Sequence, residues 1–218
     1  MLLLLALPLA HAADVSTWRN GLDDAAGWED AGGKSFDDIG EVGIRHKVIA
    51  GIDCLEGTTR APLPPDQLLT AAMDINHQGT WSSWKVPVSA RLSDGSDQFD
   101  YYQLLDNPSP VADRYWFARG TRVVSGADYS FRWEHVDPSV SYATQVQEVL
   151  TRYPGAVMTG VNVGDWTFTR EAATTRVRYR ICTDAGGSLP RWIGEIAAKT
   201  TLPTNVADII REVRRRTQ

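Results

Sequence analysis

Three histidines are the side chains of this sequence best suited to acid–base chemistry near neutral pH. His46 and His135 lie on strand phases that they share with apolar residues, and His77 lies in a polar segment. A lone inward-facing histidine is more often a hydrogen-bonded core residue than a catalyst. No Gly-x-Ser-x-Gly elbow, glycine-rich phosphate loop or telling carboxylate pair accompanies the histidines. We therefore nominate no catalytic residue, and an enzyme that uses one of these histidines stays open as the alternative.

Cys54 and Cys182 are the second candidates for chemistry. They are the only cysteines, and an even pair permits one disulfide in an exported chain. Both fall on the polar phase of their predicted strands, so we expect them to face the surface, either bridged across neighbouring strands or as two unpaired thiols. No Cys-x-x-Cys or Cys/His spacing suggests zinc. We predict neither a metal site nor a cofactor.

The first residues have the pattern of a secretory signal peptide, which we assign to residues 1–12. An apolar run ends in Ala10-His11-Ala12 and is too short to span a bilayer. No Lys or Arg precedes Arg19, which is atypical, and a buried N-terminal helix is the alternative. Residues 14–218 are long enough for a single domain with a sizeable core. We expect a periplasmic or secreted protein.

The charge balance narrows the range of partners. The net charge of −5 argues against a general nucleic-acid binder, so we predict no nucleic-acid partner. At the end of the chain, Arg211, Arg214, Arg215 and Arg216 crowd together. Cations are favoured at the C-terminus of a helix, so these arginines form either a solvated helix end or a surface for transient contact with an anionic membrane.

Residues 174–218 organise the rest of the chain. Val177, Tyr179 and Ile181 alternate with arginines, which predicts a half-buried antiparallel strand. A turn at 184–187 follows, and Ser188 with Pro190 predicts a helix start. The helix has one apolar stripe, interrupted by a predicted break at Leu202-Pro203.

The remaining chain is typical of a meander of strands with a few helices. Because strands do not alternate with helices, we predict the α+β class with an antiparallel sheet of about eight strands. Helices are predicted within 15–27, from Pro65 to Met73, and within 139–156. Strands are predicted at 42–48, 53–60, 84–92, 99–105, 115–124, 129–133 and around 166–168.

Large aromatic side chains occupy the apolar phases of these strands. In an ordinary domain they fill the core. One helix, however, covers a wide curved sheet incompletely, so the space between them is a candidate pocket for an apolar molecule. The spacing leaves both interpretations open for Trp84, Phe99, Tyr101, Phe131, Trp133, Trp166 and Phe168.

Several motifs resemble the START (StAR-related lipid-transfer) domain family, bacterial secreted type. The two most specific are the proline loop within Tyr102–Arg114 and the Gly-Gly-Ser-x-Pro-x-Trp helix start within Asp184–Ile193. The similarity covers roughly Trp28 to Arg216. Further matches are Gly164-Asp165-Trp166, Trp81 with Trp84, and Leu202-Pro203.

The resemblance implies a helix-grip fold, in which a curved antiparallel sheet wraps around a long C-terminal helix and encloses an internal apolar cavity. It implies a monomer that binds and transfers one lipid or sterol-like ligand without catalysis, gated by the C-terminal helix and the 106–112 loop. Burial would drive binding, at about 0.8 kcal/mol per methylene. The wider superfamily also implies the alternative, a cyclase- or aromatase-like enzyme acting on a hydrophobic substrate.

The resemblance also assigns site residues. Arg114 matches a family arginine on the cavity wall, but Gln103 replaces its acidic partner and Tyr115 replaces an acidic neighbour. An unpaired buried arginine is costly. We therefore expect Arg114 to pair with Asp113 or another carboxylate, to bind an anionic ligand group, or to hold the proline loop. The predicted ligand-binding residues are Arg114, Gln103, Tyr101, Phe99, Phe131, Trp133, Trp166, Phe168, Trp192, Ile193 and Ile196.

Overall fold

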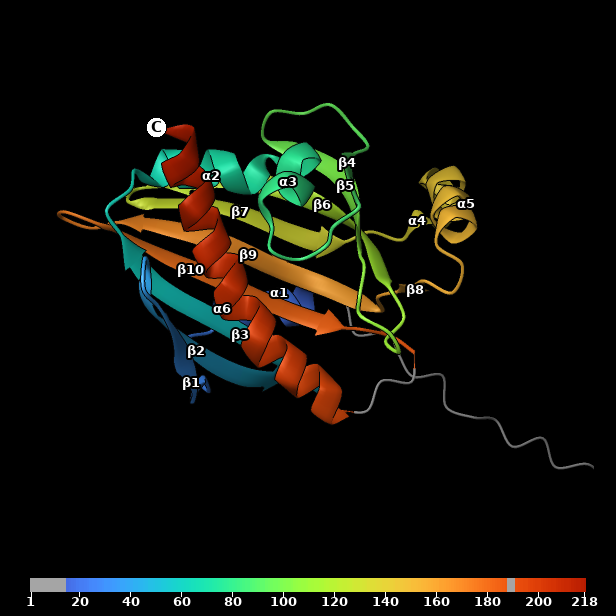
Figure 1. Ribbon diagram of the computed structural model, residues 1–218, viewed down its shortest axis with the longest axis horizontal. Helices are drawn as coiled ribbons and strands as arrows, with labels where there is room; N and C mark the ends of the chain where they lie inside the picture. The colour runs from blue at the N-terminus through green and yellow to red at the C-terminus, as the bar shows by residue number, and fades with distance from the viewer. Residues whose placement is uncertain (1–14, 188–190) are drawn as a thin grey trace, which may run out of the picture.

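One curved sheet forms most of the structure. The computed structural model of the chain describes residues 15–187 and 191–218, the second range with side chains from residue 200 on. Its ten-stranded sheet has the order β1-β2-β3-β10-β9-β7-β6-β5-β4, with β8 pairing in parallel to β6 (Figure 1). The strands are β1 (Glu29–Phe36), β2 (Gly40–Ile49), β3 (Ile52–Ala61), β4 (Val88–Arg91), β5 (Gln98–Leu105), β6 (Arg114–Ser125), β7 (Asp128–His135), β8 (Val157–Met158), β9 (Val161–Arg170) and β10 (Thr175–Asp184).

Helices lie on both faces of this sheet. Figure 1 shows α6 (Arg191–Arg216) running obliquely across one face, which we call the concave face, while α1 (Val15–Asp23) lies behind the sheet on the convex face. None of the helices in the described part of the chain is long and apolar enough to cross a bilayer. The other helical segments are α2 (Pro65–Met73), η1 (Ile75–His77), α3 (Gln78–Trp81), α4 (Pro138–Ser141) and α5 (Ala143–Arg152). The predicted α+β class and helix-grip arrangement are confirmed.

The main core lies between the concave face and α6. Val206, Ile209 and Ile210 of α6 are fully buried there. Gly57 on β3 permits this approach, because a Cβ at that position would lie only 2.4 Å from Leu202 Cδ2. The helix therefore rests directly on the backbone of β3.

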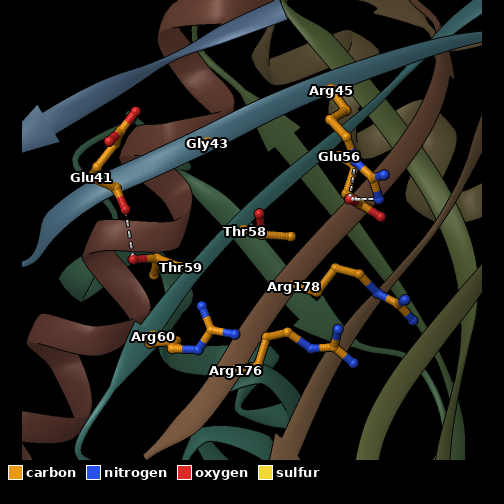
Figure 2. Close-up of a pocket in the computed structure, with 9 residues that line it drawn as sticks. All are labelled: Glu41, Gly43, Arg45, Glu56, Thr58, Thr59, Arg60, Arg176 and Arg178. Atoms are coloured by element: carbon orange, nitrogen blue, oxygen red, sulfur yellow. Dashed lines mark hydrogen bonds and ion pairs between the residues drawn. The ribbon is translucent and has the colours of Figure 1, made fainter. Parts of the chain in front are cut away.

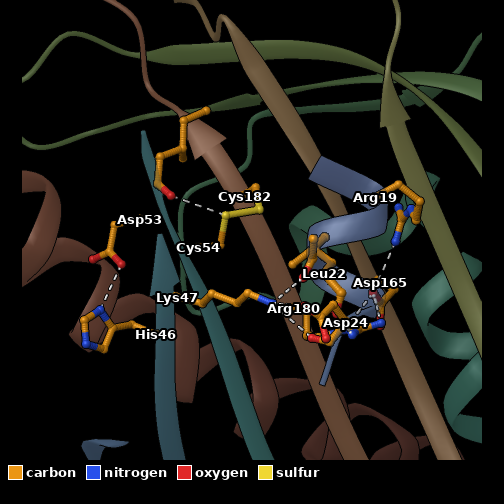
Figure 3. Close-up of a disulfide and its surroundings, with 12 residues drawn as sticks. Arg19, Leu22, Asp24, His46, Lys47, Asp53, Cys54, Asp165, Arg180 and Cys182 are labelled. Carbon is orange, nitrogen blue, oxygen red and sulfur yellow. Dashed lines mark hydrogen bonds and ion pairs between the residues drawn. A yellow bond between two sulfur atoms is a disulfide. The ribbon is translucent and has the colours of Figure 1, made fainter. Parts of the chain in front are cut away.

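A second apolar cluster lies under α1 on the convex face. Trp18 and Leu22 of α1 pack in one buried cluster with Cys54 and Cys182. The two cysteines form a disulfide (Figure 3). The expectation of surface-facing cysteines is wrong, since both side chains are fully buried. They do lie on the face opposite α6, but α1 covers that end of the convex face.

Buried charges attach α1 beside this disulfide. Asp165 on β9, with a fully buried side chain, accepts hydrogen bonds from Arg180 Nε at 3.0 Å and from Arg19 Nη1 at 3.3 Å. Arg180 also donates to Asp23 Oδ1 at 2.9 Å and to the carbonyl of Leu22. Attraction to Asp165 and Asp23 raises the pKa of Arg180 against the opposing effect of burial. The N-terminal helix is thereby joined to the last two strands.

Three segments differ from the sequence expectations. Helix α6 continues through Pro203 instead of breaking, because packing of Leu202 and Val206 outweighs the roughly 3 kcal/mol cost of an interior proline. Strand β1 was not predicted from the sequence, because it is an exposed edge strand without an apolar phase. Strand β4 begins only at Val88, after Pro87, which has no N–H to donate to a ladder.

Candidate functional site

The concave face brings together most of the predicted ligand-binding aromatics. Phe99 stacks on Phe131 with ring centroids 5.7 Å apart, and Phe131 lies 6.2 Å from Trp133. Trp133 and Trp166 both contact Tyr179, at 5.7 and 4.4 Å. The result is a continuous aromatic surface that extends from β5 to β10. It comprises Phe99, Tyr101, Phe131, Trp133, Trp166, Phe168 and Tyr179.

A polar row crosses the same face beside the aromatic surface. Thr183 of β10 is paired with Asn162 of β9, and His135 of β7 is paired with Ala118 of β6. Strand alternation places Thr183 in phase with Tyr179, and His135 in phase with Trp133. Asn162 Oδ1 accepts a 2.8 Å hydrogen bond from Trp133 Nε1. Thr183, Asn162 and His135 are therefore polar groups on a largely apolar face.

Buried polar atoms in this region lack partners within the described part of the chain. They include His135 Nδ1, Thr183 Oγ1 and the indole nitrogen of Trp81, a residue that packs against the main core. Buried polar groups are nearly always hydrogen-bonded, and each exception calls for an explanation such as a water or a ligand. Burial lowers the pKa of His135, opposed by the nearby Asp137 carboxylate. The imidazole is therefore neutral near pH 7 and can donate or accept one further hydrogen bond.

Gln103 faces the concave side, and among the described residues its amide hydrogen bonds do not go to Arg114. Its Nε2 donates to Gln78 Oε1 at 2.6 Å and to Ser89 Oγ at 2.8 Å. The amide thus connects β5 to α3 and β4. The sequence suggested a neutral partner for Arg114, whereas the structure shows a separate polar contact.

Arg114 binds backbone carbonyls. Its Nε donates to Ala185 O at 2.6 Å, Nη1 to Ala112 O at 2.6 Å and Nη2 to Gly186 O at 3.3 Å. No carboxylate among the described residues lies within ion-pair distance, so the expected pairing with Asp113 is wrong. Burial lowers the pKa of Arg114, with Asp113 opposing. Of the three expected roles of Arg114, these contacts fit the third, in which the arginine holds the proline loop.

The remaining predicted residues lie elsewhere or outside the described side chains. Trp192, Ile193 and Ile196 fall in the first turns of α6, where side chains are not described. His46 Nδ1 contacts Asp53 at 3.0 Å, and His77 Nδ1 contacts Asp74 at 2.7 Å. Both histidines therefore have carboxylate partners away from the aromatic surface.

The arginines at the end of α6 have partners within the protein. Arg211 binds Asp38 through Nε and Nη2, at 2.8 and 2.7 Å, and Arg214 donates to the carbonyl of Asp38. Arg215 and Arg216 both bind the buried Glu212. Transient contact with a membrane through this helix end stays a prediction.

Sequence reasoning missed Tyr179, Asn162 and Thr183 as members of the site. The signal was present, because Thr183 continues the alternation of Val177, Tyr179 and Ile181, and Asn162 precedes Trp166 in the same phase. The pairing of β9 with β10 places Asn162 beside Thr183. This pairing was not evident from the sequence of either strand alone. The described residues contain no group of three His, Cys, Asp or Glu that could hold a metal ion.

Comparison of the sequence with models of known families, and with curated proteins, finds no match. Solved structures do match the fold. Human StAR-related lipid transfer protein 5 superposes with a TM-score of 0.74 at 12% identity, covering 95% of this chain and 96% of that one. The STAR-related lipid transfer protein from Xanthomonas axonopodis superposes with a TM-score of 0.70 at 21% identity, covering 86% and 99% of the two chains.

A solved enzyme also shares the architecture. The Zhui aromatase/cyclase from Streptomyces sp. R1128 superposes with a TM-score of 0.54 at 15% identity, covering 76% of this chain and 95% of the enzyme. At these identities the similarity concerns the fold. The ten-stranded curved sheet, the C-terminal helix on its concave face and these superpositions together show that the chain has the helix-grip fold of the START domains.

Proposed function

We propose that the chain binds one lipid or sterol-like molecule between the concave face and α6 and releases it unchanged. The observation that carries this proposal is a pair of buried polar atoms, His135 Nδ1 and Thr183 Oγ1, that have no partner among the described residues and lie on the same face as a continuous aromatic surface. A ligand with an apolar body and one polar group matches both parts. The shared fold with proteins named for lipid transfer supports the same class of ligand.

The polar row sets the orientation of the ligand. A hydroxyl or ester oxygen would hydrogen-bond to His135 or to Thr183, which lie two strands apart, and the apolar body would extend along the aromatic surface toward Trp166. Each buried methylene contributes about 0.8 kcal/mol. A hydrogen bond to a neutral group contributes about 1 kcal/mol, so the apolar body supplies affinity and the polar row supplies orientation.

Arg114 links the two parts of the predicted lid. It binds Ala112 at the end of the 106–112 loop and also Ala185 and Gly186, in the turn between β10 and α6. Movement of the loop is thereby coupled to the turn that follows β10. We expect ligand exchange to require breaking these hydrogen bonds.

The ligand proposal is tested by mass spectrometry of organic extracts from the purified chain. We expect a stoichiometric lipid in the wild type and a reduced amount in a His135→Leu/Thr183→Val variant, since a polar ligand group would lose whichever of the two partners it uses. His77→Gln is the matched control, because His77 is exposed and pairs with Asp74. Wild-type protein that stays empty after refilling with sterols, fatty acids and phospholipids would refute the proposal.

The role of Arg114 is tested by ligand transfer between vesicles. Arg114→Gln removes at least two of the carbonyl contacts, so we expect faster release of a bound fluorescent lipid with little change in its affinity. Arg152→Gln, an exposed substitution in the last turn of α5, is the charge-matched control. Equal release rates in the two variants would contradict the coupling of the loop to the turn that follows β10.

An enzyme of the aromatase or cyclase type is the second candidate. The observation that favours it is the position of His135, a neutral imidazole on the concave face whose Nδ1 has no hydrogen-bond partner among the residues that the structure describes. A hydrophobic polyketide-like substrate recovered chemically altered, with turnover lost in His135→Gln, would replace the carrier proposal. A ligand recovered unchanged would support the carrier.

We further propose that the chain works in the periplasm or outside the cell. The disulfide between Cys54 and Cys182 supports this location, because disulfides persist mainly in oxidising compartments. Fractionation of the native cells, with the N-terminus of the isolated protein sequenced, would test both the location and the signal peptide assigned to residues 1–12.

A further inference from the structure

A polar cleft of about 540 Å³ lies on the convex face, formed by β2, β3 and β10 (Figure 2). Its position follows from strand alternation, because Arg176 and Arg178 point away from the face that holds Val177 and Tyr179. The cleft is within the size range of small-molecule sites. It has no part in the concave site proposed above.

Ion pairs account for only some of the charges that line this cleft. Arg45 and the buried Glu56 form a closed pair with contacts of 2.5 and 2.9 Å. Arg60 at the rim is bound by Glu171 at 2.8 Å. Figure 2 shows Arg60, Arg176 and Arg178 apart from the Arg45–Glu56 pair.

Among the described residues, Arg176 has no ion pair, and Arg178 has only a 3.9 Å contact with Asp165, a carboxylate that Arg180 already binds. The structure gives Arg176 one hydrogen bond, from Nη2 to Thr169 Oγ1 at 3.4 Å, and no ion pair among the described residues. Glu41 is the remaining carboxylate of the lining. Glu41 offsets one of these two arginines at most, so the cleft keeps a positive excess.

Arg178 is the more strongly desolvated of the two. Its Nε is buried without a hydrogen-bond partner in the described residues, and its Nη2 reaches Thr167 Oγ1 at 3.3 Å. Asp165 lies 3.9 Å away but is already bound by Arg180. Burial lowers the pKa of Arg178 and repulsion from Arg180 adds to this, against attraction from Asp165 and Glu56. A half-buried cation with an N–H that lacks a partner among the described residues is stabilised when an anion binds it.

The cleft has room for such an anion. The two arginines are two residues apart on one strand, so their Cα atoms lie about 6.8 Å apart. On the β2 side the lining residue is Gly43, and a Cβ added there would meet nothing nearer than Thr58 Oγ1 at 3.8 Å. Gly43 therefore adds no side chain to the β2 side of the cleft, while the guanidinium groups of Arg176 and Arg178 extend on the other side, toward Thr169 and Thr167 of β9.

We propose that this cleft binds a phosphate group held by Arg176 and Arg178, with Arg60 at its rim. Guanidinium groups form strong bidentate hydrogen bonds with both carboxylates and phosphates. A phosphate fits better here, because its oxygens point in several directions and can accept from two separated guanidiniums at once.

The proposal is tested by calorimetric titration of the purified chain with inorganic phosphate and with glycerol phosphate at low ionic strength, where screening is weak. We expect saturable binding of one phosphate per chain. Arg176→Gln and Arg178→Gln should each weaken it about tenfold or more, the effect of losing charge-assisted hydrogen bonds. The charge-matched control Arg152→Gln should bind as the wild type does. The proposal would be overturned if Arg152→Gln weakened phosphate binding as much as the two cleft variants do. It would also be overturned if none of the phosphate probes showed saturable binding.

A second variant separates the cleft from general charge effects. Gly43→Leu keeps every arginine and adds a side chain to the β2 side of the cleft, so we expect it to abolish phosphate binding while thermal unfolding shows a folded protein. Wild-type affinity in Gly43→Leu would place the binding outside the cleft and contradict the proposal.

Vesicles distinguish the two sources of the phosphate. We would compare sedimentation with phosphatidylcholine vesicles that contain or lack phosphatidic acid, for the wild type and Arg176→Gln. Binding of glycerol phosphate in solution identifies a soluble phosphate ester. Binding only to phosphatidic acid vesicles, lost in Arg176→Gln, identifies a lipid headgroup. Binding to neither refutes the site, and in every case the ligand content of the concave face should be unchanged.

Discussion

Loss of the Cys54–Cys182 disulfide should lower the free energy of unfolding by several kcal/mol. The bridge joins residues separated by 128 positions, so it removes much of the conformational freedom of the unfolded chain. The chain-entropy relation for a loop of this length gives about 5 kcal/mol at 25 °C. This is an upper value, because residual structure in the unfolded chain reduces it.

Packing adds a separate contribution. Both sulfur atoms are buried beneath Trp18 and Leu22, so a Cys54→Ala/Cys182→Ala variant also leaves a small cavity. Reduced wild-type protein keeps both sulfurs and loses only the crosslink. Comparison of oxidised, reduced and double-alanine protein therefore separates the entropic term from the packing term.

The assay is urea unfolding followed by tryptophan fluorescence. For a chain of this size the urea m-value is about 2–3 kcal/mol per molar, so a loss of about 5 kcal/mol lowers the midpoint by about 2 M. The m-value itself should rise, because the uncrosslinked chain exposes more surface when unfolded. A loss below about 1 kcal/mol in the reduced protein would show that the crosslink does not stabilise the fold in this way.

Two further predictions concern buried ionisable groups. Asp165→Asn keeps the shape but leaves Arg180 buried with only the half-exposed Asp23, so we expect a loss of about 3–5 kcal/mol in urea unfolding. The exposed control Asp97→Asn should cost below about 1 kcal/mol, and similar losses in both would refute the reasoning. For His135, the pKa in the folded protein lies below its ordinary value of 6.5, so the unfolded chain binds more protons just below that pH. Stability should therefore fall as pH drops below about 6.5 toward the folded pKa, and melting temperatures should show a shallower fall in His135→Gln. An identical pH profile in that variant would contradict the assignment.

The sequence predicted the architecture because its strongest patterns are local. The alternation in β10 and the apolar stripe of α6 are properties of adjacent residues, and each appears in the structure as an inward-facing row. The predictions that were wrong concern contacts between segments that are distant in the sequence. Pro203 was expected to break the helix because the packing of Leu202 on β3 is not visible in the helix sequence.

The candidate site was predictable only in its apolar part. Aromatic residues in one strand phase are sufficient to predict an inward aromatic surface. The polar row requires knowing that β9 pairs with β10, which places Asn162 beside Thr183. The contacts of Arg114 depend on the turn after β10, which lies 71 residues away along the chain. Burial of the cysteines likewise depends on packing against α1, which is a separate segment from β3 and β10, the strands that carry the cysteines.

The strand order has a consequence for how the protein assembles. Strand β10 lies between β3 and β9, so it alone joins the N-terminal three strands to the strands made later in the chain. Before β10 pairs, β3 and β9 each present an open edge of unpaired backbone groups. The docking of α1 also waits for β10, since its partners Asp165 and Arg180 flank that pairing. The two halves of the sheet are joined by backbone hydrogen bonds only through β10, and contacts of such long sequence separation predict slow folding.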